Sequence, residues 1–199
     1  RTPLTSDRLL DGAVDVAWYH RFRSKFDDKR WTTVDRYVKF ASSGAGHARA
    51  RLYGETMDAR VSREELLRRI TEKRNNDAVR AFGLLPLPPG EEEREVTLRY
   101  NEYLEYKHQS RVFGSMRQAS EKLAVMIGME NLARTAGYPD PLRLQWAMEA
   151  KTVEDLREGI AVTLGDLVVR LDFDPFGDPR VTATKGEKML KEIPAAAKK

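Results

Sequence analysis

The sequence predicts a mainly α-helical fold, a multi-helix bundle or array, followed by a small C-terminal antiparallel β-meander. Apolar residues recur at three- and four-residue steps through most of the first 150 residues, which is the period of an amphipathic helix. After Gly159 the apolar period changes to two, which is typical of strands. At 199 residues the chain is long enough to bury a core without covalent cross-links.

The N-terminal part divides into short helical stretches. A continuous apolar stripe over residues 10–22 predicts a first helix, and similar stripes predict helices over residues 31–41 and 48–53. Ser62 and Glu65 have the spacing of a capping box, so a further helix is expected to begin directly after Ser62.

A proline-rich segment interrupts this helical pattern at residues 84–90, where three prolines and a glycine predict a linker. Three glutamates then open an expected helix over residues 91–113. The longest apolar stripe follows and should end at Gly137, a C′ glycine. Asp140 followed by Pro141 predicts the N-cap and first position of another helix.

The C-terminal part is expected to form a meander buried on one face. Gly165 and Asp166 form a two-residue hairpin turn, and residues 180–184 supply a third strand. Such a small sheet needs a surface to lie on, and we expect the helices to supply it. The predicted cross-strand pairs are Leu164 with Leu167, Val162 with Val169, and Ile160 with Leu171.

These elements suggest five parts. They are an N-terminal helical lobe (1–83), a proline-rich linker (84–90), a central helical lobe (91–159), a β-meander packed on the helices (160–194) and a frayed tail (195–199).

The composition excludes several kinds of site. The chain has no cysteine, which excludes disulfides, thiolate metal sites and a cysteine nucleophile, and favours a reducing, cytoplasmic compartment. Its three histidines lack the spacing of a zinc motif, and no phosphate loop or nucleophile elbow is present. The acidic loop 172–178 lacks the bidentate glutamate of a calcium loop. We therefore predict no catalytic residue, no metal ligand and no cofactor, and no apolar run is long enough to predict a membrane span.

The net charge of +4 is carried entirely by the first 50 residues, where aromatic side chains lie among basic ones. This pattern permits a nucleic-acid-binding segment over residues 18–40. Aspartates interrupt the segment, however, and its aromatic residues fall on the apolar stripes, so a solvated face with a core side is favoured. The basic residues of this alternative are Arg21, Arg23, Lys25, Lys29 and Arg30.

The segment from residue 111 to residue 150 places polar residues within an apolar stripe. Such groups must be paired when buried, which favours an interhelical hydrogen-bond network. A pocket for a phosphate or carboxylate, or an enzyme site with Glu121, Glu130 or Glu149 as acid or base, are the alternatives. The candidate residues of the network or pocket are Arg117, Glu121, Asn131, Arg134, Arg143, Trp146 and Glu149.

The same segment, with residues 12–22, 70–87 and 186–194, resembles part of very large bacterial proteins of unknown function, the molybdate-metabolism-regulator-like proteins, some of which carry WGR domains. The resemblance implies an internal, mostly helical segment whose partner is the remainder of a larger parent protein. It implies no activity and no catalytic residues. No WGR domain lies within these residues. The resemblance therefore suggests nucleic-acid association only through a domain that some of the similar proteins carry elsewhere.

The leading hypothesis is therefore a non-enzymatic structural and interaction module of a large cytoplasmic bacterial protein. The alternatives are a nucleic-acid-associated module using residues 18–40 and an unrecognised enzyme with an arginine and glutamate pocket on helices 115–150.

Overall fold

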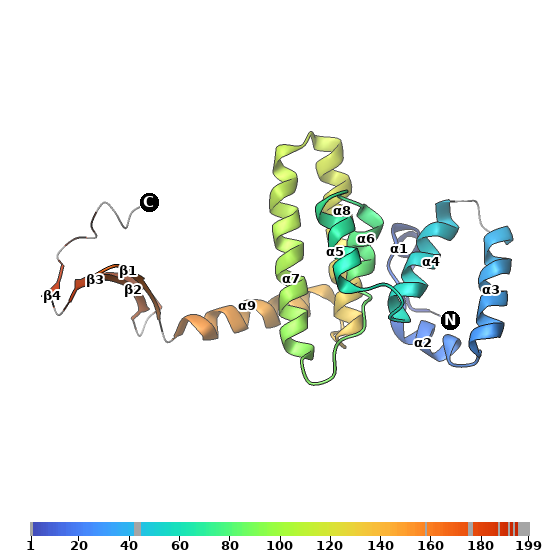
Figure 1. Ribbon diagram of the computed structural model, residues 1–199, viewed down its shortest axis with the longest axis horizontal. Helices are drawn as coiled ribbons and strands as arrows, with labels where there is room; N and C mark the ends of the chain where they lie inside the picture. Colours follow the sequence, from blue (N-terminus) through green and yellow to red (C-terminus); the bar gives the residue numbers. More distant parts are fainter. Residues whose placement is uncertain are drawn as a thin grey trace. The chain divides into compact units, whose positions relative to one another are not determined.

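The computed structural model describes residues 2–41, 45–157, 159–174, 177–186, 188–190, 192 and 194. In these residues, helices are followed by a four-stranded antiparallel sheet, which confirms the predicted fold class (Figure 1). The contacts divide the chain into two compact units, Arg1–Leu144 and Gln145–Lys199. The expected linker at 84–90 lies inside the first unit, and the predicted domain boundaries stay predictions. The expected frayed tail, 195–199, lies outside the described residues.

The first expected helix is in fact two helices, α1 (Ser6–Asp11) and α2 (Val16–Arg23). Gly12 ends α1 with a φ of +103°, a left-handed conformation that glycine adopts without steric cost. Asp15 then caps α2, since its side chain accepts a hydrogen bond from the backbone N–H of Trp18 at 2.9 Å. An interpretation based on the apolar stripe alone therefore misses the helix end at Gly12 and the helix start at Asp15.

The next three helices agree with the sequence in position. They are α3 (Asp28–Ala41), α4 (Ala45–Met57) and α5 (Arg63–Thr71). The Ser62 hydroxyl accepts a hydrogen bond from the backbone N–H of Glu65 at 3.2 Å, which confirms the predicted cap.

A short helix that the sequence analysis missed, α6 (Asn76–Phe82), lies in the centre of the first unit. Five of its seven residues are buried, and it packs against α4, α5 and α8. Asn75 caps it by accepting a hydrogen bond from the backbone N–H of Ala78 at 2.8 Å. The proline-rich connection that follows begins with two buried leucines, Leu84 and Leu85, so its first part belongs to the core.

The last helices of the first unit form an α7–α8 hairpin (Figure 1). Helix α7 (Glu92–Gln109) leads through a 3₁₀ turn, η1 (Ser110–Val112), to α8 (Ser115–Thr135), and α9 (Pro141–Arg157) follows. Gly137 has a φ of +78°, and Asp140 accepts a hydrogen bond from the backbone N–H of Arg143 at 2.9 Å. Both predicted helix-end signals are thus confirmed.

Not every apolar residue of this hairpin is buried. Ala119 is exposed, and the exposed fractions of Leu104 and Met116 are 42% and 88%. Met116 lies in the first turn of α8, whereas the buried residues of this helix begin at Glu121, where α8 packs against α6 and α7.

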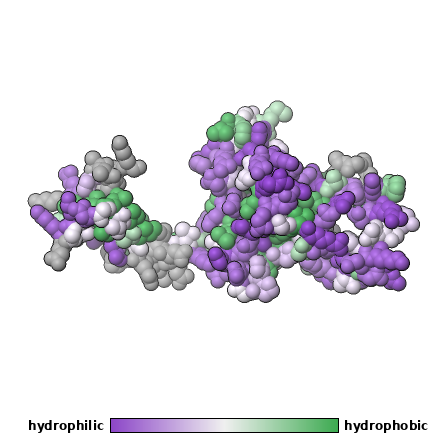
Figure 2. Space-filling model, viewed as in Figure 1, coloured by the Kyte–Doolittle hydropathy of each residue, from purple (hydrophilic) through white to green (hydrophobic). Residues whose placement is uncertain are grey.

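The second unit contains the sheet, with strand order β1-β2-β3-β4. The strands are β1 (Ile160–Leu164), β2 (Leu167–Phe173), β3 (Pro179–Lys185) and β4 (Lys188–Met189), of which β4 was not predicted. All three predicted cross-strand pairs of the β1–β2 hairpin are confirmed. Figure 2 shows hydrophobic side chains gathered over these strands. That this face packs on the helices stays a prediction.

Within the described part of the chain, no helix combines the length and the hydrophobicity that crossing a membrane requires.

Candidate functional site

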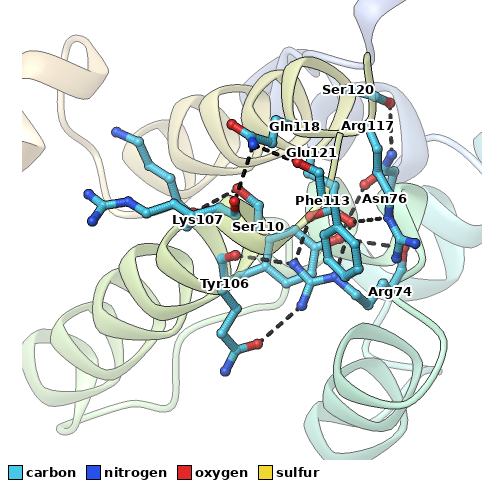
Figure 3. A network of polar contacts seen from close by, with 12 residues as sticks. Arg74, Asn76, Tyr106, Lys107, Ser110, Phe113, Arg117, Gln118, Ser120 and Glu121 are labelled. Atoms are coloured by element: carbon cyan, nitrogen blue, oxygen red, sulfur yellow. Dashed lines mark hydrogen bonds and ion pairs between the residues drawn. The ribbon is translucent and has the colours of Figure 1, made fainter. Parts of the chain in front are cut away.

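The main candidate site is a buried carboxylate held by two arginines (Figure 3). Glu121 on α8 is only 2% exposed. Arg74 approaches both of its oxygens, with Nε 3.0 Å from Oε1 and Nη2 2.7 Å from Oε2. Arg117, one helical turn before Glu121, adds a third hydrogen bond from Nε to Oε1 at 3.0 Å. We call Arg74, Arg117 and Glu121 the clamp.

Aromatic rings fix the planes of the two guanidinium groups. The guanidinium of Arg74 lies 4.1 Å from the centroid of the Tyr106 ring and 5.0 Å from that of Phe113. The Arg117 guanidinium lies 3.6 Å from the centroid of the Phe113 ring. Stacking of this kind adds cation–π attraction and reduces the freedom of both arginines before they meet the carboxylate.

Further hydrogen bonds connect the clamp to the surrounding elements. Arg74 also donates to Oε1 of Gln109 at 3.1 Å and to the backbone carbonyl of Tyr106 at 3.2 Å. Asn76, at the start of α6, donates to the Ser120 hydroxyl at 3.0 Å (Figure 3). The network therefore ties the connection between α5 and α6 to both helices of the α7–α8 hairpin.

The backbone at Arg74 is itself unusual, since its φ is +45°. A side chain other than glycine occupies this left-handed region at a cost, and it does so only where surrounding contacts hold it there. The hydrogen bonds and ring contacts of the Arg74 side chain are such contacts.

The electrostatics of the clamp keep Glu121 ionised. Burial by itself raises the pKa of Glu121, but the hydrogen bonds and charges of Arg74 and Arg117 outweigh it and bring the pKa below its usual value. The hydrogen bond to Glu121 in turn raises the pKa of Arg74. A general acid needs a raised pKa, so this carboxylate is poorly suited to proton transfer near neutral pH.

Asn131, which sequence analysis placed in the same network or pocket, forms a separate site on α8. Its side chain is completely buried. The Oδ1 atom accepts a hydrogen bond from the backbone N–H of Val14 at 2.9 Å. Its Nδ2 atom donates to the carbonyls of Gly12 at 3.2 Å and Arg80 at 3.1 Å. Asn131 thus joins the α1–α2 connection and α6 to α8, which supports the network interpretation over an open pocket.

Glu130 and Arg134 form a third group on α8. Glu130 is buried and contacts the guanidinium groups of Arg134 and of Arg8 on α1. Glu121 and Glu130 are nine residues apart, about 13.5 Å along a helix axis. The residues predicted as one network or pocket therefore divide into separate groups.

The remaining predicted residues lie on α9. Arg143 lies in the first turn of α9, within the first unit. Trp146 is 53% exposed, and Glu149 is exposed and accepts a hydrogen bond from Gln145 at 2.7 Å; both lie in the second unit. Within the described residues, no group of three histidine, aspartate or glutamate side chains forms a potential metal site.

The basic segment 18–40 is partly neutralised by aspartates, two of its own and one that follows α4. Arg23 forms ion pairs with Asp28 and, at 3.0 Å, with Asp58, while Arg30 lies 3.6 Å from Asp27. The other three basic residues of the predicted set, Arg21, Lys25 and Lys29, are exposed.

Most aromatic residues in the first half of this segment contact one another, whereas Tyr37 and Phe40 near its end are exposed. The Trp18 and Phe22 rings stack at 5.0 Å, and Phe26 and Trp31 lie 5.0 and 6.3 Å from Phe22. Rings that contact one another have fewer free faces for stacking nucleic-acid bases, although Trp18 is 43% exposed.

Besides helix α6, sequence analysis missed two features of the first unit that bear on its candidate sites. One is Arg74, the main partner of Glu121, which no local signal identifies because it lies 47 residues away. The other is a pocket of about 450 Å³ between α2, α3 and α4, with Tyr19 and Trp31 in its wall. The Tyr19 hydroxyl donates to Oδ1 of Asp58 there at 3.0 Å.

No curated protein and no solved structure matches the chain. The sequence model of a family of unknown function (DUF5724) matches residues 2–148, which include helices α1 to α8 and all three polar groups on α8. Since this match covers well over half of the 199 residues, the chain belongs to the DUF5724 family of unknown function.

Proposed function

We propose that this chain is a non-enzymatic structural and interaction module of a large cytoplasmic bacterial protein. The observation that carries the proposal is that the buried polar groups of α8 are paired within the chain. Both Glu121 oxygens are engaged by arginines of the same chain, and Asn131 is engaged by three backbone groups. Groups that are satisfied internally support packing rather than substrate binding.

The surface of α3 supports the interaction part of the proposal. No described side chain of this helix is buried, and Tyr37 and Phe40 are 69% and 80% exposed. Val38 adds a further exposed apolar side chain between them. Neighbouring exposed apolar residues often mark protein contacts. We propose that the partner is the remainder of a longer parent protein, in keeping with the resemblance to an internal segment of large proteins.

Hydrogen exchange tests the interaction. Amides of α3 should exchange more slowly in the parent protein than in the isolated chain, because a partner segment covers the helix. Serine at Tyr37 and Phe40 should abolish this difference, whereas serine at Thr33 and Lys39, two exposed polar positions of the same helix, should leave it. Equal exchange rates of the α3 amides in the two proteins would contradict the proposed contact.

The non-enzymatic part has its own test. The purified chain is incubated with panels of nucleotide and ester substrates, and no turnover is expected. Reproducible turnover that Glu121→Gln abolishes without unfolding the chain would instead favour the enzyme alternative.

A further inference from the structure

A groove of about 510 Å³ lies along the C-terminal half of α7, η1 and α8, apart from the clamp residues. Basic side chains dominate its lining. Lys107 and His108 come from α7, Arg111 comes from η1, and Lys122 comes from α8. All four are exposed. The groove is as large as typical small-molecule sites, which have volumes of roughly 300–1,000 Å³.

The basic side chains of the groove differ from most arginines of the first unit in lacking carboxylate partners. Within the described residues, none of the four side chains forms a hydrogen bond or an ion pair, whereas Arg74 and Arg99, for example, each contact a glutamate. In Figure 3 the Lys107 side chain extends away from the polar network. Like charges gathered in one groove repel one another, and a bound anion would relieve that repulsion.

The C-terminus of α7 explains only part of this charge. A helix C-terminus carries about half a negative charge, which favours Lys107 and His108 in the last turn. Arg111 lies beyond the helix and Lys122 lies on another helix, so the basic charge exceeds what the helix end can balance. The one carboxylate in the lining, Glu105, accepts a hydrogen bond from Gln109 Nε2 at 2.9 Å.

We propose that this groove binds a phosphate group, as a phosphomonoester or a diphosphate. Three permanent cations and one carboxylate leave the lining with two excess positive charges, which match the two negative charges of a phosphate dianion. A guanidinium such as that of Arg111 can form two parallel hydrogen bonds to phosphate, while lysine supplies a compact charge. Leu104 is the one aliphatic side chain in the lining, which makes the groove unsuited to apolar ligands.

The phosphate can come from a soluble molecule or from a lipid headgroup. Val112 and Met116, close in sequence to Arg111, are 83% and 88% exposed and would suit a membrane surface. The probes are therefore inorganic pyrophosphate and vesicles of phosphatidylcholine with and without phosphatidic acid. Binding of pyrophosphate alone identifies a soluble ligand, and binding of the phosphatidic acid vesicles identifies a headgroup.

The test is a titration of the full chain and two variants at about 50 mM salt, where charge screening is modest. Replacing Arg111 and Lys122 with glutamine should weaken binding of the phosphate probe at least about tenfold, the effect of losing one charge-assisted hydrogen bond. The control variant, Arg36→Gln with Lys73→Gln, changes two exposed basic residues of the first unit outside the groove. It makes the same change in net charge and should leave the dissociation constant unchanged. All three proteins should have the same melting temperature, because these side chains are exposed.

Three results would overturn the proposal. The first is no binding of either phosphate probe. The second is an equal loss of affinity in both variants, which would indicate attraction by net charge alone. The third is groove-dependent binding of a single-stranded oligodeoxynucleotide that pyrophosphate does not displace, which would make the groove a nucleic-acid surface instead.

Discussion

Arg74 and Glu121 lie 47 residues apart in the sequence, yet two nitrogens of the arginine contact both oxygens of the carboxylate, at 3.0 and 2.7 Å. Arg74 belongs to the connection between α5 and α6, and Glu121 is buried on α8. This contact fixes a strained backbone segment to the longest helix of the first unit. Removing either partner leaves the other in an environment that water reaches poorly.

Arg74→Ala should lower the free energy of unfolding by about 3–5 kcal/mol, because it removes two of the three hydrogen bonds that compensate a buried charge. Arg117→Ala should cost no more than about 1 kcal/mol, since half of the Arg117 side chain is exposed. Urea unfolding of both variants measures the difference. Equal losses would show that the two arginines share the carboxylate evenly.

The clamp should also make the stability of the fold depend on pH in the acidic range. The folded-state pKa of Glu121 is lowered, so the unfolded chain takes up this proton first, near pH 4.3 as for an ordinary glutamate. The stabilisation is therefore complete above about pH 4.3 and is lost as the pH falls through the lower folded-state pKa. Melting temperatures are measured from about pH 6 to about pH 2, roughly two pH units on either side of the unfolded-state pKa. They should fall less steeply for Glu121→Gln than for the wild type. Parallel curves would contradict the lowered pKa.

Asn131→Ala should destabilise the fold through the backbone groups that it leaves unpaired. The amide serves Val14, Gly12 and Arg80, and an unsatisfied buried polar group costs about 1–3 kcal/mol. For a chain of this size, each kcal/mol lowers the melting temperature by about 2–4 °C. The matched control is Asn101→Ala at an exposed position of α7, which should change little. An unchanged melting temperature for Asn131→Ala would refute the network interpretation.

Gly83→Ala should reveal how closely the end of α6 approaches α8. An added Cβ atom at this position would lie 2.6 Å from the backbone nitrogen of Leu132 and would also clash with the carbonyl oxygen of Gly128. Backbone atoms of a packed helix cannot easily move aside, so we expect a loss of about 1–3 kcal/mol, as for other overpacked cores. Gly114→Ala is the control, because a Cβ atom there meets nothing within 4 Å. Thermal melts compare the two variants, and similar melting temperatures would show that α6 and α8 can separate without cost.

The features that could be predicted from sequence are those with local physical causes. The Ser62 cap and the Gly137 helix end each depend on residues within one turn. The hairpin at Gly165 sets the register of β1 and β2 through the length of its turn alone. The single helix expected over residues 10–22 was wrong because apolar periodicity continues across Gly12, although the backbone does not.

The features that could not be predicted depend on contacts between distant segments. Helix α6 is only seven residues long, and its burial on nearly all sides gives no amphipathic pattern to detect. The sequence could place Glu121 and Asn131 on the inner side of a helix, but it could not identify Arg74 or the Gly12 carbonyl as their partners. These pairings depend on how α6 and α2 pack against α8.

The hydrogen bond between Asn131 and the N–H of Val14 spans 117 residues, which has a consequence for synthesis on the ribosome. Chains are synthesised at about 5–20 residues per second, so roughly 6–23 s pass between the addition of Val14 and that of Asn131. Throughout that interval the connection between α1 and α2 lacks the amide that fixes its conformation. This connection can therefore reach its final hydrogen bonding only after α8 has been synthesised. Folding of the first unit is thus completed from its carboxyl-terminal side.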